Sequence, residues 1–190
     1  MHRSTSGGRA ISLDSKRRSS TCLRRDGAPY ADQLKSALVT EQLQPWHENI
    51  SKRQVKAPKV FIKDSGLLHA LWGVGTRDQL EVHPQMGSSW EGFVSAQLRR
   101  HLRARKSFFW ATHQGAELDL LVMDVPKQLG FEIKRTTTPK MTASMHAAMT
   151  SLALHRLEVI HAGDHTFPLA PKVRAVAASR LLLDISPIGK

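Results

Sequence analysis

Two acidic residues and a lysine have the types and the spacing of a metal-assisted hydrolytic site. Asp119 is followed, after twelve intervening residues, by Glu132, Ile133 and Lys134. If these residues lie on two adjacent strands, Glu132 and Lys134 project from the same face, because side chains alternate along a strand. A hairpin would return Asp119 beside them. The two carboxylates and the Ile133 carbonyl would then supply the oxygen ligands that Mg²⁺ prefers.

Such a site favours hydrolysis of a phosphodiester. A bound Mg²⁺ acidifies a water molecule for in-line attack on phosphorus, and Lys134 can orient that water or stabilise the transition state. The alternative for Asp119, Glu132 and Lys134 is a salt-bridged patch on a solvated face of a sheet. Glu117 is either a third acid of the site or an exposed side chain.

The second half of the chain supplies the elements that must position these residues. Ser88 or Ser89 is predicted to cap a helix whose apolar stripe runs from Trp90 to Leu102. A second helix is expected to begin with Thr138 as its cap and Pro139 at its first position. Alternation and turn residues predict three strands between the helices and one after them, at 107–110, 116–123, 129–134 and 157–161. The expected fold is therefore α/β, with the element order αβββαβ.

The chain is expected to have three parts. Residues 1–29 are basic and lack apolar periodicity, which predicts a disordered tail. Residues 30–83 are predicted to form a small helical or winged adaptor segment, and residues 84–190 form the αβββαβ domain. Within the adaptor segment we expect a helix from Tyr30 to Leu43, a strand at 59–62, and a helix at 66–72 capped by Asp64 or Ser65.

Charge and cysteine content limit the classes of partner and compartment. The chain has 28 Lys and Arg against 16 Asp and Glu, a formal charge of +12, which favours a nucleic acid, expected to be DNA. A single cysteine, Cys22, is typical of a reducing compartment, so we expect the cytoplasm. No apolar run is long enough to cross a membrane. A basic run after the first predicted helix is either a phosphate-binding track or a solvated helix end: Arg99, Arg100, Arg103, Arg105 and Lys106.

Several motifs, in order, resemble those of a known family. They are QPWHEN (44–49), KRQVKAPKV (52–60), DSGLL (64–68), WEGFV (90–94), GAELD (115–119) and EIK (132–134). Over roughly residues 30–180 the chain resembles DUF4143, the domain of unknown function that follows the ATPase core of AAA-type ATPases in bacteria and archaea. It also resembles the PD-(D/E)xK nuclease superfamily. That resemblance implies a restriction-endonuclease-like core, a site formed by Asp119, Glu132 and Lys134, and a role for Glu91 as its helical acid. Glu91 can also be read as an acid favoured by the helix dipole.

One feature of that family is missing from this sequence. No G-x-x-x-x-G-K-[ST] phosphate-binding loop occurs, so ATP hydrolysis is not expected. We expect the chain to correspond to the C-terminal part of a longer protein, with a basic leader in place of the ATPase. Two functions therefore remain open. The first is a Mg²⁺-dependent nuclease, and the second is a catalytically silent module that binds DNA, a protein partner or an ATPase core.

Overall fold

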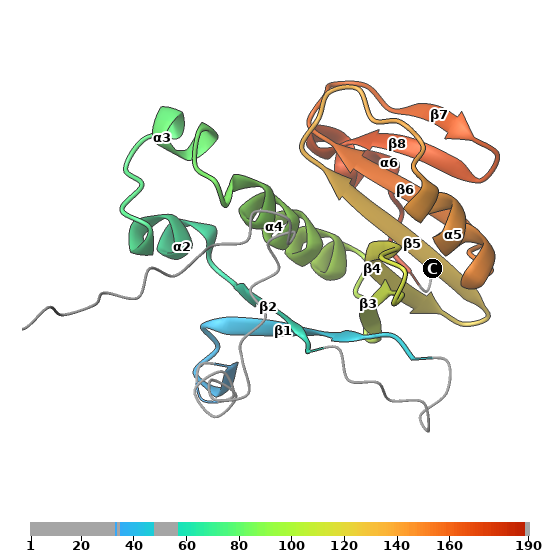
Figure 1. Ribbon diagram of the computed structural model, residues 1–190, viewed down its shortest axis with the longest axis horizontal. Helices are drawn as coiled ribbons and strands as arrows, with labels where there is room; N and C mark the ends of the chain where they lie inside the picture. The colour runs from blue at the N-terminus through green and yellow to red at the C-terminus, as the bar shows by residue number, and fades with distance from the viewer. Residues whose placement is uncertain (1–32, 34, 48–56, 189–190) are drawn as a thin grey trace, which may run out of the picture.

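A sheet of eight strands organises the part of the chain that the structure describes, which is residue 33, residues 35–47 and residues 57–188 of a computed structural model (Figure 1). The strand order is β2-β1-β3-β4-β5-β6-β8-β7. The strands are β1 (Thr40–Pro45), β2 (Lys59–Ile62), β3 (Ser107–Ala111), β4 (Glu117–Asp124), β5 (Lys127–Lys134), β6 (Arg156–His161), β7 (Phe167–Ala170) and β8 (Val173–Ala177). The predicted basic tail lies outside the described residues.

Helices cover both faces of this sheet. The helices are α2 (Ser65–Leu71), α3 (Arg77–Glu81), α4 (Met86–His101), α5 (Ala143–Ser151) and α6 (Leu181–Asp184), with a 3-10 turn, η3 (Ala178–Arg180), before α6. Val94 and Leu98 of α4 pack with Leu120, whereas Met145 of α5 packs with Leu121 in a second apolar cluster. Because consecutive strand residues point to opposite faces, α4 and α5 lie on opposite sides of the sheet.

The predicted element order is confirmed. From α4 onward the chain forms α4, β3, β4, β5, α5 and β6, which is αβββαβ in an α/β fold. β3, β4 and β5 are antiparallel neighbours, and α5 connects β5 to the parallel strand β6. The segment 167–176 was expected to add edge structure, and β7 does form the edge. The parallel pairing of β8 with β6 was not predicted.

The predicted helix from Tyr30 to Leu43 is wrong from Thr40 onward, where the chain forms β1. Leu38, which the helical pattern would bury, is 70% exposed and has a positive φ of 61°. Leu43 instead is buried in the sheet, where β1 pairs with β2 on one side and β3 on the other. Pairing with distant strands overrides the local helical periodicity here. The division into three parts stays a prediction. In the structure, β1 and β2 of the second part belong to the same sheet as the strands of the third part.

Two predicted helix starts are also wrong. α4 begins at Met86 with Gln85 as its N-cap, before Ser88 or Ser89, and no side-chain hydrogen bond caps it. α5 begins at Ala143, where the Thr142 hydroxyl accepts a hydrogen bond from the Met145 N–H, rather than at Pro139. At α5 the sequence offers two threonines as caps, Thr138 and Thr142, and the structure uses the second.

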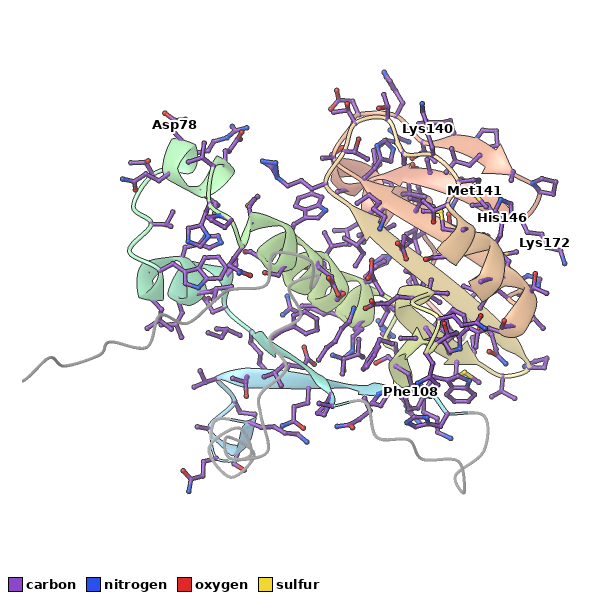
Figure 2. All side chains as sticks on the ribbon, in the orientation of Figure 1. Asp78, Phe108, Lys140, Met141, His146 and Lys172 are labelled. Carbon is purple, nitrogen blue, oxygen red and sulfur yellow. The ribbon has the colours of Figure 1, made fainter. Side chains whose placement is uncertain are left out.

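The predicted Asp64 cap of α2 is confirmed, because the Asp64 carboxylate accepts a hydrogen bond from the Leu67 N–H, and the helix begins at Ser65, one residue before the predicted start. α3, which was not predicted, begins with a reciprocal capping box between Thr76 and Gln79. Figure 2 shows Asp78 on α3 at the opposite end of the molecule from Lys172 in the β7–β8 turn. None of the helices in the described ranges has the length and apolar content needed to cross a bilayer.

Candidate functional site

The predicted acids and lysine meet in one pocket beside the start of α4. Its volume is ≈ 260 Å³. Four carboxylates and two ammonium groups line it, together with the first turn of α4. We call this site the acid pocket, and its residues are Lys59, Pro84, Gly87, Ser88, Glu91, Glu117, Asp119, Glu132, Ile133 and Lys134.

The β4–β5 pair brings Asp119 to Glu132 and Lys134, as the spacing predicted. Lys134 Nζ lies 2.5 Å from Glu132 Oε1. The regular β4–β5 pairing ends at Leu120, and beyond it Asp119 Oδ2 accepts a hydrogen bond from the Ile133 N–H at 2.9 Å. The Asp119 carboxylate therefore takes the place of the next backbone acceptor and fixes the end of β4 to β5.

A shift in strand register accompanies this geometry. Phe108 pairs with Leu121 and Trp110 with Leu118, so β4 has one residue more than β3 over this stretch. Leu118 consequently packs in the α5 cluster although Leu120 packs in the α4 cluster. Such a bulge re-aims the side chains beside it. Asp119 lies at this bulge, and this departure from strict alternation was not predicted.

Lys59, a residue that sequence reasoning did not single out for the site, lies at the centre of the acid pocket. Its Nζ lies 2.7 Å from Glu91 Oε1, 2.7 Å from Glu117 Oε1 and 3.4 Å from Asp119 Oδ1. The residue is only 3% exposed. Glu91 and Glu117, which sequence reasoning left open, thus both lie in the pocket.

Gly92 explains how β2 can bring Lys59 so close to α4. A Cβ at Gly92 would lie 2.8 Å from Cδ1 of Phe61, closer than atoms pack. Phe61 follows Lys59 by two residues on β2, and Glu91 precedes Gly92 on α4. The glycine therefore allows the close approach of strand and helix that places Lys59 against Glu91.

Burial and mutual repulsion raise the pKa values of two of the carboxyl groups. Burial, followed by the negative charge of Asp119, raises the pKa of Glu91 to about 7, although Lys59 opposes the shift. The same two causes raise the pKa of Glu132 to about 7, against the opposing effect of Lys134. Burial by itself would lower the pKa of Lys59, but the carboxylates of Glu91, Asp119 and Glu117 raise it above its ordinary value.

The acid pocket is partly buried: Lys59 and Glu132 are buried, whereas the other four charged side chains are half-buried. Glu132 is 3% exposed, and its Oε2 is buried with no hydrogen-bond partner among the described residues. The carboxylates outnumber the ammonium groups by two. An unpaired buried oxygen and this charge excess both fit a divalent cation held by Asp119 and Glu132.

Lys59 competes with a divalent cation for the carboxylate oxygens of the acid pocket. Its ammonium already contacts one oxygen each of Glu91, Glu117 and Asp119. In keeping with this, no group of three or more His, Cys, Asp or Glu side chains in the described ranges is arranged to hold a metal ion. Ile133 contributes its N–H to Asp119, and the role of its carbonyl as a metal ligand stays a prediction.

The basic run at the end of α4 lies apart from the acid pocket. Eight residues separate Glu91 from Arg99, or about 12 Å along a helix at 1.5 Å per residue. Arg99 forms an ion pair with Glu41 at 2.6 Å, and its side chain is 23% exposed. The other four basic side chains are exposed: Arg100, Arg103, Arg105 and Lys106. These four are the members of the run that a nucleic acid could contact most readily.

Comparison with known families assigns half of the chain to one family. The model of the family described as Domain of unknown function (DUF4143) matches residues 86–181, which is half of the chain. The chain belongs to the DUF4143 family. The matched segment runs from the first residue of α4 to the first residue of α6, and includes every residue of the predicted site. A second model, Domain of unknown function (DUF8612), matches residues 19–78.

Two curated proteins carry a closely related segment. They are uncharacterized proteins of Mycobacterium bovis and Mycobacterium tuberculosis, and each is 48% identical to this chain over 153 residues. The match covers 80% of this chain and 35% of each relative, so this DUF4143 chain spans about a third of the length of the curated relatives it matches. No solved structure matches the chain.

Lys59 is the charged residue of the acid pocket that was not predicted from the sequence, although it lies in the motif at 52–60. One signal was available. Four acids and one lysine were gathered as candidates, and a buried cluster of that composition requires further positive charge. The sequence alone did not indicate which of the many basic residues would supply it.

Proposed function

We propose that this chain is a nuclease-like, nucleic-acid-associated domain that cleaves phosphodiester bonds with Mg²⁺ in the acid pocket. The observation that carries the proposal is the excess of two carboxylates in a partly buried site, where the Oε2 of Glu132 is buried without a hydrogen-bond partner among the described residues. A divalent cation is the partner whose charge and oxygen preference match that excess. The element order αβββαβ, with Asp119 and Glu132-Ile133-Lys134 on adjacent strands, supports a PD-(D/E)xK relationship.

The residues of the acid pocket have separate tasks in this proposal. Asp119 and Glu132 would hold the Mg²⁺, which supplies charge neutralisation and an acidified water when bound. Lys134 orients the attacking water or stabilises the charge that develops on the phosphate. Gly87 and Ser88 present the start of α4, where backbone N–H groups and the helix dipole favour a phosphate. Lys59 holds Glu91 and Glu117 in place.

Plasmid nicking tests this function. Purified protein with Mg²⁺ or Mn²⁺ is expected to nick supercoiled plasmid, and Lys134→Ala is expected to reduce the rate by about 10²–10³-fold, as for loss of one transition-state stabiliser. Asp119→Asn is expected to reduce it comparably. Lys127→Gln, at the other end of β5, is the control and should cleave like the wild type. Equal cleavage by all four proteins would contradict the assignment.

A catalytically inactive module that binds DNA, a protein or an ATPase core is the second candidate. It is favoured by Lys59, whose ammonium already compensates part of the negative charge in the acid pocket. Under this alternative, binding should be indifferent to Mg²⁺, and no nicking should occur. A pull-down of plasmid by the same protein, with and without EDTA, separates it from the nuclease.

The exposed basic side chains at the end of α4 give a separate prediction about DNA. Replacing Arg103 and Arg105 with glutamine is expected to weaken binding to a DNA duplex. The slope of log affinity against log salt should fall by about 0.9 for each phosphate that the protein no longer neutralises. The double variant Lys127→Gln/Lys140→Gln is the charge-matched control (Lys140 in Figure 2). Fluorescence anisotropy between low and physiological salt measures both slopes, and identical slopes would exclude this helix end as the binding surface.

A further inference from the structure

A second and larger pocket lies at the carboxyl ends of three parallel strands. In the register of the sheet, Lys134 of β5 pairs with His161 of β6, and His161 pairs with Ala177 of β8. The three strands therefore end side by side. The next residue after each strand lines a pocket of ≈ 710 Å³: Arg135, Ala162 and Ala178. We call this pocket the strand-end crevice.

The position of the strand-end crevice is one at which α/β proteins bind ligands. Ligands of open α/β sheets bind in crevices outside the carboxyl ends of the parallel strands. A volume of ≈ 710 Å³ lies within the usual range for small-molecule sites. Here the loops after β5 and β6 are held together, because the Thr136 carbonyl accepts a hydrogen bond from the Ala162 N–H at 2.9 Å.

The lining of the crevice combines hydrogen-bond donors, an apolar wall and two carboxylates, those of Glu81 and Asp164. Leu80, Met86 and Trp90 form the apolar wall, and hydroxyl groups come from Thr137 and Ser179. Two guanidinium groups, those of Arg77 and Arg135, also line it. Arg77 Nε lies 3.0 Å from Glu81 Oε1, whereas Arg135 Nη2 lies 3.9 Å from Glu81 Oε2. Arg135 is thus a cation held only loosely, and its donors suit a phosphate group.

The strand-end crevice adjoins the acid pocket at two places in the chain. Lys134 lines the acid pocket and Arg135, the next residue, lines the crevice. Likewise Gly87 lines the acid pocket and Met86, the residue before it, lines the crevice. The two pockets therefore flank the first turn of α4, so one extended ligand could occupy both.

We infer that the strand-end crevice is a nucleotide subsite, which binds the nucleotide next to the phosphodiester in the acid pocket. Arg135 contacts the phosphate of that nucleotide, and Trp90 with Met86 covers its base. Aromatic and apolar side chains accept any base, so the subsite contributes affinity rather than sequence preference. This inference rests on the proposed function for its biological meaning, but binding of a nucleotide in the crevice can be measured without cleavage.

Thymidine 5′-monophosphate, titrated into the full chain by calorimetry in the presence of EDTA, is the probe. Wild type is expected to bind it more tightly than either thymidine or inorganic phosphate, because the subsite holds both halves. Arg135→Gln is expected to weaken binding about tenfold or more, as for loss of a charged hydrogen bond. Trp90→Ala should weaken binding of thymidine as well, whereas Arg135→Gln should leave thymidine binding unchanged. Lys127→Gln, at the far end of β5, is the control.

The outcomes distinguish the subsite from the proposed reaction. Loss of nucleotide binding in Arg135→Gln, without plasmid nicking by the wild type, would support the subsite and count against the nuclease. Nicking by the wild type, with equal nucleotide affinity in Arg135→Gln and Lys127→Gln, would overturn the subsite alone. Absence of nucleotide binding by the wild type, or an affinity no greater than that for phosphate, would also overturn it.

Discussion

Replacing Lys59 with methionine is expected to lower the free energy of unfolding by about 3–5 kcal/mol at pH 8, the range found when one partner of a buried ion pair is removed. Methionine keeps much of the volume of the side chain but removes the ammonium that contacts Glu91, Glu117 and Asp119. Those carboxylates would then lie in a buried pocket with only Lys134 to balance them. Urea denaturation followed by circular dichroism measures the change.

Two changes of conditions should restore stability to Lys59→Met if its instability comes from the lost charge rather than from lost packing. Lowering the pH below 7 should reduce the deficit of Lys59→Met, because Glu91, whose pKa is raised to about 7, becomes neutral. Addition of Mn²⁺ at pH 8 should reduce it too, if a cation takes the place of the ammonium. Lys63→Met, which removes an exposed lysine just after β2, is the control and should change the stability by less than about 0.5 kcal/mol. Equal stabilities of the two variants at pH 8 would show that Lys59 is not the counter-ion of the pocket.

The parts of the fold that could be predicted from the sequence are those set by local pattern. β3, β4, β5 and β6 form runs of alternating or continuous apolar residues bounded by turns, and each was predicted to within a few residues. β1 could not be predicted, since its strand state depends on pairing with β2 and β3, which lie about 20 and 60 residues away. The start of α5 was predicted four residues too early, because Thr138 and Thr142 are equally good caps by sequence.

In the candidate site, too, the residues related by local sequence could be predicted and those related by distant packing could not. Asp119 and Lys134 could be placed together, because one turn between adjacent strands fixes their relation. Lys59 reaches Asp119 across 60 positions in the sequence, through the approach of β2 to α4 that Gly92 allows. The strand-end crevice was beyond prediction as well, since it depends on the parallel pairing of β8 with β6. Asp119, Glu132 and Lys134 line one pocket. Their catalytic role stays a prediction.

The stability of the domain is expected to fall as the pH rises from about 5 to about 8, through the titration of Glu132 and Glu91. Both groups have pKa values raised to about 7 in the folded protein, against an ordinary value of 4.5. Between these two pH values the folded state binds more protons than the unfolded state, so raising the pH favours unfolding. A shift of this size corresponds to about 3 kcal/mol for one carboxyl group. The contribution is present below pH 4.5 and is lost as the pH rises through 7.

Comparison with Glu132→Gln isolates this effect from that of the other ionisable groups of the protein. Glutamine cannot ionise, so the variant should gain stability relative to the wild type by about 3 kcal/mol between pH 5 and pH 8. Mg²⁺ should stabilise the wild type at pH 8 and have a smaller effect on the variant, since the cation binds the ionised carboxylate. Asp78→Asn, on the exposed surface of α3 (Figure 2), is the control. Parallel stability curves for Glu132→Gln and the wild type across this range would mean that the pKa of Glu132 in the folded protein is close to its ordinary value.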